Sequence, residues 1–452
     1  MSTIDRIDSL RQTLDGLDRL SGVPFEIVVV VGPDAGETVE YLTGRSDLAA
    51  IISNPTRNLS RSRNLGIDVA RGEFVAFIDD DAYPSERWLS DLLGEFDNLE
   101  VAAVGGEVFD YSGFSHQAVY SRATRAGDAS IALRSPIRGL TETPAASSFD
   151  YPMGTNLIAR RTALLDVGGF DEQYDYFLDE TDLVRRLLDS GWIVRVVRGG
   201  HVFHKFLPSS IRGEARIALD RRSILVNRAY FAARHQAPFE STIRVRADFE
   251  RFIERSRGEI ASALEAGIAT DQDVANHELA ITEAELRLSG WLRERPHATR
   301  HVPNPELVIR SREVTIEHPK GDRPHLAVIV SSPPEHAVLE RRSREIAQGA
   351  GVVRVIELEG PFSSVDLEGG VWRHRLAPSL KSLPEDVSPT LGDPVGCATL
   401  AEEVDRISRE FWPIDLVIAE PDSDVASVLA GRGYRVDGAA EPEDESPTPD
   451  DG

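Results

Sequence analysis

Short apolar runs alternate with amphipathic stretches along the first 109 residues of the chain. The runs are continuous and rich in β-branched or aromatic side chains, as is typical of strands buried on both faces, and they are residues 25–31, 49–53 and 74–78. Between them, apolar side chains recur at helical spacing in residues 4–20 and 60–70. This alternation of strand and helix predicts an α/β domain with a mostly parallel sheet and covering helices.

The middle of the chain is less regular. Residues 111–150 are polar and lack periodicity, so we expect a long functional or mobile loop there. Strands are expected at 156–159 and 193–197, with a helix between them that carries leucines on one face. Residues 210–295 have a helical but patchy apolar stripe, which indicates helices packed on the first domain and then a spacer.

A second α/β pattern occupies the last third of the chain. Strands are expected at 326–332, 352–358 and 415–419, and helices at 337–348 and 424–430. The pattern resembles a small Rossmann-like three-layer unit, although its first turn has no Gly-x-Gly-x-x-Gly. We therefore predict an α/β domain, a helical spacer, a Rossmann-like α/β unit and a disordered acidic tail, over residues 1–235, 236–320, 321–437 and 438–452.

The charge and composition narrow the class of protein. The net charge is -25, from 75 acidic and 50 basic residues, which argues against nucleic acid as a main partner. The single cysteine, Cys397, excludes an intrachain disulfide. No signal-peptide core and no apolar run of membrane-spanning length is present. These features predict a cytoplasmic protein with no integral membrane segment, for which peripheral contact with the inner face of a membrane stays open.

Three carboxylates, Asp79, Asp80 and Asp81, follow the apolar run 74–78 directly. The carboxyl ends of central strands are where open α/β sheets bind their ligands. Alternate residues can point to the same side, so Asp79 and Asp81 can share one divalent cation, and oxygen ligands of this kind suit Mg²⁺ or Mn²⁺. Such a cation can in turn hold a diphosphate. The alternative on this stretch alone is an acidic loop that is simply solvated, and the two interpretations carry equal weight.

Four blocks of the sequence resemble the family 2 glycosyltransferases, which are inverting enzymes with a GT-A fold. The resemblance runs over about residues 8–235. The blocks follow the family's order and are FEIVVVVGPDAGET, NLSRSRNLGIDVARGEFVAFIDDDAYP, GTNLIARRTALLDVGGFDEQYDYFLDETDL and HVFHK. One Asp-x-Asp motif would be weak evidence, whereas four blocks in order are specific. The resemblance implies a GT-A-like α/β domain that uses a nucleotide-sugar donor and a divalent metal.

The resemblance also implies a role for each residue near the metal. Asp79 and Asp81 would frame the metal site, with Asp81 the better candidate for a direct ligand. His204 is similar in position to a histidine that completes such sites, and His201 is the alternative. For either histidine, a hydrogen-bonded strand-end residue is the structural interpretation that competes.

Other residues would contact the donor by the same resemblance. The residues concerned are Asp34, Arg63, Asn64, Asp80, Gly154 and Asn156. Arg63 and Asn64 fall in the first turns of a helix, where backbone N–H groups favour anions, but a plain exposed helix face explains them equally well. Gly154 and Asn156 would lie near the donor sugar.

An inverting transfer needs one carboxylate to take the proton of the acceptor hydroxyl. The candidates are Asp179, Glu180 and Asp182. The family's motif is usually Glu-Asp with the aspartate as base, and here the pair is reversed, so the assignment stays open between Glu180 and Asp182. Acids in the first turn of a helix also stabilise it by about 0.3–1 kcal/mol each, which is the structural alternative.

The chain departs from the family at its start. The family's first strand should precede residue 8, and no apolar run is found there, so either the start codon is placed late or the nucleotide pocket lacks one wall. The Gln-x-x-Arg-Trp signature of processive synthases is absent, which favours transfer of a single sugar to a saccharide or lipid-linked hydroxyl acceptor. Two other classes remain as hypotheses: a non-catalytic glycosyltransferase-like binding or assembly module, and a nucleotidyltransferase, which would more often carry an early Gly-rich basic loop.

Overall fold

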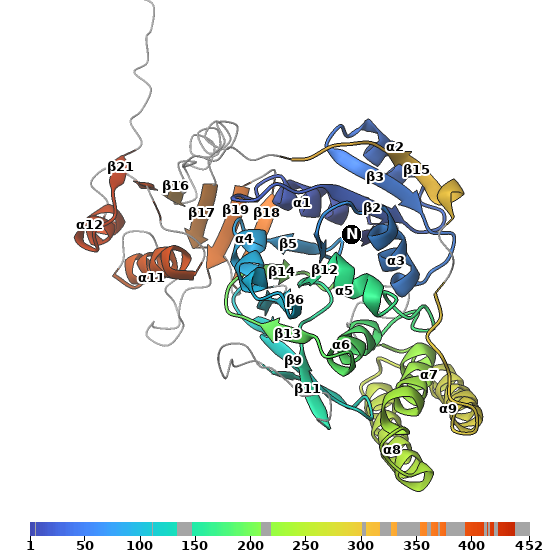
Figure 1. Cartoon of the computed structure of the whole chain (residues 1–452). Coiled ribbons are helices and arrows are strands. Elements are labelled where there is room, and N and C mark those ends of the chain that lie inside the picture. Colours follow the sequence, from blue (N-terminus) through green and yellow to red (C-terminus); the bar gives the residue numbers. More distant parts are fainter. Residues whose placement is uncertain are drawn as a thin grey trace, which may run out of the picture. The chain divides into compact units, whose positions relative to one another are not determined.

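The computed structural model of the chain divides into two compact units, Met1–His318 and Pro319–Gly452 (Figure 1). The residues that the structure describes are 1–4, 6–110, 112–132, 147–208, 218–300, 304–316, 327–331, 353–358, 363–368, 371–376, 394–410, 414, 416–419 and 424–438. Among the helices within these ranges, none is both long enough and apolar enough to span a membrane.

The first sheet of the first unit contains the strands predicted near the amino terminus. Its order is β1-β2-β3-β15, and these strands are Ser2–Thr3, Ile27–Val31, Leu48–Ser53 and Val308–Ser311. The pairs β1–β2 and β2–β3 are parallel, whereas β15 runs antiparallel to β3. The helices α1 (Ile7–Leu17) and α2 (Gly36–Gly44) connect β1, β2 and β3, and α3 (Leu59–Val69) follows β3. The strand β15 lies in the stretch expected to be a helical spacer, and the sequence pattern did not predict it.

The second sheet has the order β13-β6-β12-β4, and its strands are Ile193–Val196, Val101–Gly105, Leu157–Arg160 and Phe74–Phe77. The strand β12 is antiparallel to both β4 and β6, while β13 is parallel to β6. A bridge between Ser2 and Asp79 joins the end of β1 to the residues just after β4. The α/β class predicted from the sequence is therefore present, with pairing more mixed than expected because β12 and β15 run against their neighbours.

Two smaller sheets lie beside this framework. One has the order β5-β14-β7-β8, with strands Ala82–Pro84, Val202–His204, Val108–Phe109 and His116–Ala118. The other has the order β10-β9-β11, with strands Ala129–Ala132, Tyr120–Thr124 and Ser148–Tyr151. The expectation of an irregular stretch at 111–150 is wrong for its described part. Four short strands form there: β9, β10 and β11 pair with one another, and β8 pairs with β7. These strands carry few apolar residues, which leaves little periodicity in the sequence.

The remaining helices of the first unit are α4 (Trp88–Leu93), η1 (Gly94–Asp97), α5 (Arg161–Asp166), α6 (Asp179–Asp189), α7 (Arg222–Phe231), η2 (Ala232–Gln236), α8 (Thr242–Glu265), α9 (Asp271–Trp291) and η3 (Pro305–Leu307). The helices α7, α8 and α9 share one apolar core, to which Leu225, Val245 and Ile281 contribute. They lie together at one side of the first unit (Figure 1). The domain boundary expected at residue 235 stays a prediction.

The second unit has one described sheet of order β18-β19-β17-β16-β20-β21. Its elements are β16 (Ala327–Ser331), β17 (Val353–Leu358), β18 (Ser364–Glu368), β19 (Val371–Leu376), α11 (Pro394–Glu410), β20 (Leu416–Ala419), α12 (Asp424–Gly431) and β21 (Val436–Gly438). All pairs except β18–β19 are parallel. The predicted strands β16, β17 and β20 and the predicted helix α12 are present. The helix expected at 337–348 and the acidic tail beyond residue 438 lie outside the described residues.

An apolar cavity is lined by residues of β2 and β4, together with Met1 and Trp88. The ammonium group of Met1 donates to the carbonyl oxygen of Val28 at 3.1 Å, and burial lowers the pKa of this group to about 6. The strand β1 thus occupies the place where the resemblance expects the family's first strand, although two polar residues leave no apolar run for a sequence pattern to reveal.

Candidate active site

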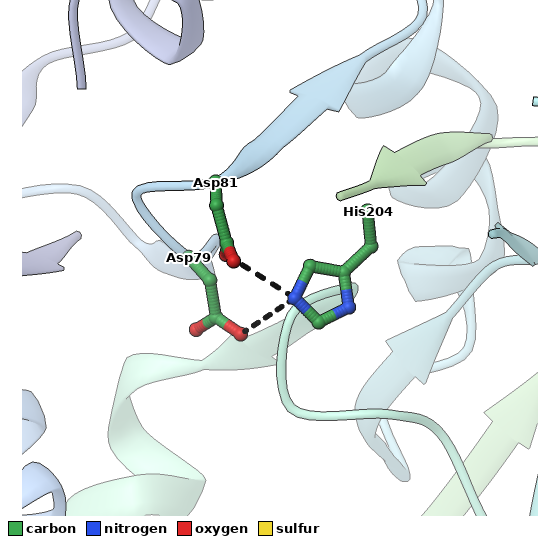
Figure 2. A group of neighbouring side chains, drawn as sticks. All are labelled: Asp79, Asp81 and His204. Carbon is green, nitrogen blue, oxygen red and sulfur yellow. Dashed lines mark ion pairs between the residues drawn. The ribbon is translucent and has the colours of Figure 1, made fainter. Parts of the chain in front are cut away.

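The acidic turn after β4 lies opposite a histidine from a strand far along the chain. The turn leads into β5, and β14 pairs antiparallel with β5 so that His204 stands opposite Ala82. The Nε2 atom of His204 lies 3.2 Å from Asp81 Oδ1 and 3.8 Å from Asp79 Oδ2. Figure 2 shows both carboxylates directed at the same ring nitrogen. One ligand atom from each of the three residues lies within 4.8 Å of the others, which is close enough for all three to hold one metal ion.

The electrostatics of this cluster suit a divalent cation. Burial alone would raise the pKa of Asp81, but the hydrogen bonds from His204 and from the Leu207 N–H, together with Arg6, outweigh it and lower the pKa to about 2. The Asp81 side chain is 2% exposed, whereas that of Asp79 is 34% exposed. A charged, fixed carboxylate, a second carboxylate open to the pocket and an imidazole form a donor set that fits Mn²⁺ or Mg²⁺.

Asp80 faces the start of α1, not His204. Its Oδ1 lies 3.3 Å from Arg6 Nη1, and its backbone carbonyl accepts a hydrogen bond from Ser9 Oγ at 2.8 Å. Burial raises the pKa of Asp80 to about 6, and Arg6 only partly offsets this. The middle acid of the triplet therefore anchors α1 against the turn.

A cavity of about 370 Å³ opens in front of the acidic turn. Its walls come from five segments, and the lining residues include Ser2, Thr3, Ile4, Arg6, Asn58, Ser62, Asp79, Asp80, Asp81, Asp175, Tyr176 and His204. The sequence analysis considered that the nucleotide pocket lacks one wall. Residues of β1 and the turn after it line one side of this cavity, and the missing wall stays a prediction.

Arg63 lies between the acidic turn and helix α6. Its Nη1 makes an ion pair with Asp179, and its Nη2 lies 3.8 Å from Asp79 Oδ1. The guanidinium also lies over the ring of Phe170, 5.1 Å from the ring centroid. A Cβ added to Gly154 would come within 2.8 Å of Arg63 Nη2, so a larger residue there would displace the guanidinium. Arg63 is buried, and the interpretation as a plain exposed helix face does not hold for it.

Three of the residues expected at the donor are placed differently. The Asn64 amide donates to the carbonyl oxygen of Phe170 and accepts from its N–H, which fixes the turn before α6. Asn156 accepts from Trp88 Nε1 at 2.8 Å and donates to two backbone carbonyl oxygens. Asp34 is exposed in the turn after β2 and is not among the residues that line the cavity. The contacts of Asn64 and Asn156 are those of packed structural amides.

Asp182 is enclosed by cationic partners. Its side chain is 0% exposed, and it lies 2.7 Å from both His235 Nε2 and Arg186 Nη2. Burial acts to raise the pKa of Asp182, but Arg186 and the His235 hydrogen bond prevail and lower it well below the usual value. Asp179 is likewise committed to its ion pair with Arg63.

Glu180 has the opposite electrostatics. Burial and the neighbouring Asp179 raise its pKa to about 8, and the attraction of Arg63 is too small to compensate. Unlike Asp179 and Asp182, Glu180 is only half-buried. A general base works best when its pKa lies near the working pH and its oxygen can reach the substrate. Of the three acids in the first turn of α6, Glu180 fits this description.

The loop before α6 has an unusual backbone. Phe177 and Leu178 have φ values of 72° and 66°, in the left-handed region that non-glycine residues rarely adopt. Helix α7 fixes the loop, because Asn227 Nδ2 donates to the carbonyl oxygen of Tyr176 at 2.6 Å and Ser223 Oγ donates to Asp175 at 2.9 Å. Since Asp175 and Tyr176 line the cavity, α7 helps to shape it, which no sequence motif indicated.

His201, the alternative to His204, belongs to a different cluster. Its Nε2 lies 3.1 Å from Glu107 Oε2, and the Glu107 carboxylate also lies 3.5 Å from His116 Nε2. Burial acts to raise the pKa of Glu107, but the hydrogen bonds to His116 and His201 outweigh it. The pKa of Glu107 therefore lies well below its usual value. The structure thus directs His204, and not His201, at Asp79 and Asp81.

The sequence of this chain is similar to those of known glycosyltransferases. The model of glycosyl transferase family 2 matches residues 1–164. The pre-mycofactocin glycosyltransferase of Mycobacterium tuberculosis is 28% identical over 190 residues, which are 40% of this chain and 38% of that protein. The N-acetylglucosaminyl-diphospho-decaprenol L-rhamnosyltransferase of the same species is 32% identical over 106 residues, 22% of this chain and 34% of that protein. The chain thus spans less than two fifths of the length of these relatives.

A solved structure of S. aureus TarS residues 1–349 in complex with UDP-GlcNAc is 15% identical, with a TM-score of 0.44, over 64% of this chain and 81% of that one. A likeness at this level is too distant to support a functional conclusion. The family match covers the acidic turn, Arg63 and the residues of β12. Residues 1–164 of the chain are therefore similar to glycosyl transferase family 2, and they lie within the first unit, whose described part is an α/β domain.

Proposed function

We propose that this protein is a metal-dependent, inverting glycosyltransferase that moves a single sugar from a nucleotide-sugar donor to a hydroxyl acceptor. The observation that carries the proposal is the meeting of two acidic clusters at Arg63. On one side, Asp79, Asp81 and His204 form a donor set for a divalent cation. On the other, Arg63 pairs with Asp179, directly before the half-buried Glu180.

A divalent cation in this site would neutralise the diphosphate of the donor and so make it a better leaving group. The carboxylates of Asp79 and Asp81 and the Nε2 atom of His204 would hold the ion. The cavity in front of them, lined in part by Ser2, Thr3 and Tyr176, would receive the nucleotide.

Glu180 would act as the general base. As the acceptor oxygen forms its bond to the anomeric carbon, the bond between that carbon and the phosphate oxygen breaks, and the hydroxyl proton passes to the Glu180 carboxylate. The products are the inverted glycoside and a nucleoside diphosphate. Asp182 would take no part in this step, since it is fully enclosed by His235, Arg186 and Arg234.

The acceptor in this proposal is a saccharide or a lipid-linked sugar. The name of one relative, the rhamnosyltransferase, describes a lipid-linked acceptor. In the same proposal residues 1–235 carry the chemistry and the helices that follow support them. The rival hypothesis is a non-catalytic binding or assembly module, and the experiment that follows tests both hypotheses.

The test is donor binding and turnover with and without metal. We expect the full chain to bind a nucleoside diphosphate by calorimetry in the presence of Mn²⁺, and to lose this binding in EDTA and in Asp81→Asn. We also expect it to release nucleoside diphosphate from at least one member of a panel of nucleotide-sugars. The binding module would be favoured if the chain binds nucleoside diphosphate only with metal, releases no nucleoside diphosphate from any donor, and transfers no sugar to any saccharide or polyprenyl-phosphate acceptor. Binding that Asp81→Asn leaves unchanged would remove the metal site from the proposal.

A further inference from the structure

The second ring nitrogen of His204 has a partner of its own. Nδ1 lies 2.9 Å from Gln117 Oε1, on the side of the ring away from the carboxylates. Figure 2 shows the Nε2 atom toward Asp79 and Asp81 and the other nitrogen pointing away from them. The ring is buried. Its two nitrogens therefore face two different protein groups, and each group constrains the proton of the ring.

Gln117 reaches His204 from a strand that the sequence analysis did not expect. It is the central residue of β8, which pairs with β7, and β7 pairs in parallel with β14. Phe109 of β7 stacks on His116 at 4.7 Å between ring centroids and on Phe203 at 5.2 Å. His116 and Phe203 directly precede Gln117 and His204 in the sequence. Their stacking on Phe109 therefore holds β8 against β14 and keeps the side chains of Gln117 and His204 in contact.

The chemistry of a metal site requires one particular tautomer of His204. A metal ligated by Nε2 needs the lone pair of that nitrogen, so the ring proton must be on Nδ1. An amide oxygen accepts a hydrogen bond and cannot donate one. Gln117 Oε1 at Nδ1 therefore stabilises a proton on Nδ1, so that Nε2 can give up its hydrogen bond to Asp81 and offer its lone pair to a metal.

We infer that Gln117 is a positioning residue of the metal site, which sets the tautomer and the orientation of His204. The inference rests on the proposed function, since it concerns the metal ligands of that proposal. Outer partners of metal-bound histidines commonly contribute about 10–100-fold in metal affinity. The opposite orientation of the amide would place an NH₂ group at Nδ1 and a proton on Nε2, and His204 could then not bind metal.

The experiment is a metal titration of the full chain and three variants. Free Mn²⁺ is measured by electron paramagnetic resonance, and the melting temperature of each variant reports its folding. We expect Gln117→Leu, which removes the acceptor, to weaken Mn²⁺ binding about 10–100-fold. Gln117→Glu keeps an oxygen at Nδ1 and should bind Mn²⁺ within a few-fold of the wild type. Gln272→Leu, an exposed site on α9, is the matched control and should bind as the wild type does.

The outcomes separate this inference from the proposed function. If the wild type binds Mn²⁺ and Gln117→Leu binds it equally well, the role of Gln117 is refuted while the metal site stands. If Gln117→Glu loses affinity as strongly as Gln117→Leu, the residue acts through packing and the inference is also refuted. If the wild type binds no Mn²⁺, the proposed metal site itself fails. Imidazole ¹⁵N NMR of the metal-free protein gives a second readout, and a neutral His204 ring with its proton on Nε2 would contradict the assignment.

Discussion

The acidic turn at residues 79–81 and the first turn of α6 at residues 179–182 each carry three acids, and Arg63 contacts one acid from each. In both clusters one acid has a lowered pKa and another has a raised one. The pKa values are about 2 for Asp81 and about 6 for Asp80, and in α6 the pKa is lowered for Asp182 and raised to about 8 for Glu180. The same residue types in similar numbers therefore reach similar electrostatic extremes.

The clusters differ in which acid is left for a ligand. In the turn, the acid with the low pKa faces His204 and the cavity, while Asp80, with the raised pKa, is used to anchor α1. In α6 the arrangement is reversed, because His235 and two arginines enclose the acid with the low pKa, and Glu180 is the more exposed one. A charged acid beside a histidine suits a metal, and an acid with a pKa near neutrality suits proton transfer.

The largest effect on stability is expected at Asp182. Asp182→Asn would leave Arg186 buried without its counter-charge, and losing one partner of a buried ion pair costs about 3–5 kcal/mol. The free energy of unfolding of the first unit should fall by this amount in a denaturant titration. Asp8→Asn is the control, since the Asp8 side chain is 91% exposed, its partner Arg11 is 48% exposed, and this pair should contribute no more than about 1 kcal/mol. Equal losses in the two variants would show that Asp182 is not specially enclosed.

A smaller effect, of opposite sign, is expected at Glu180. The pKa of Glu180 is about 8 in the folded protein against an ordinary value of 4.5, so the folded state binds an additional proton between these pH values. Stability from this group is complete below pH 4.5 and is lost as the pH rises toward 8. Glu180→Gln lacks the titration and should melt at a higher temperature than the wild type at pH 8.5, with the difference shrinking toward pH 5. A melting difference that does not depend on pH would contradict the raised pKa.

The smallest effect is expected at Asp80. Because its carboxylate contacts Arg6 and not His204, Asp80→Asn should change the affinity for Mn²⁺ by no more than a few-fold, whereas Asp81→Asn should abolish it. Both variants are measured by the same metal titration at pH 7.5. A loss at Asp80 as large as that at Asp81 would mean that the middle acid also serves the metal.

Much of the framework could be predicted because its strands are continuous apolar runs. The strands β2, β3, β4 and β12 of the first unit and β16, β17 and β20 of the second were expected at nearly their observed positions. The strands β8 to β11 and β15 were not, since they carry too few apolar residues to show a period, and β15 also pairs with β3 from far along the chain. Mixed pairing around β12 likewise depends on the path of the chain, which a local pattern does not record.

The candidate site divides in the same way. Asp79, Asp81 and His204 were singled out by their motifs, and the structure brings them together. Gln117 and Arg6 carry no motif, and their contacts depend on segments that meet only in the folded chain. The choice between Glu180 and Asp182 was open from the sequence, because adjacent acids in one helical turn look alike until their neighbours are known. The ion pair of Arg63 with Asp179 joins residues 116 positions apart, beyond the reach of any local pattern.

The most direct test of the account is a single-turnover comparison of Glu180→Gln and Asp182→Asn with the wild type, at saturating donor and Mn²⁺. If Glu180 is the base, its replacement should slow sugar transfer by about 10²–10⁴-fold, with nucleotide affinity within a few-fold of the wild type. The wild-type rate should rise with pH to a plateau above about pH 8, because the pKa of Glu180 is raised to about 8. The folded Asp182→Asn variant should transfer sugar at nearly the wild-type rate. Transfer by Glu180→Gln at the wild-type rate, or a folded Asp182→Asn that binds donor but does not transfer, would contradict the assignment of the two acids.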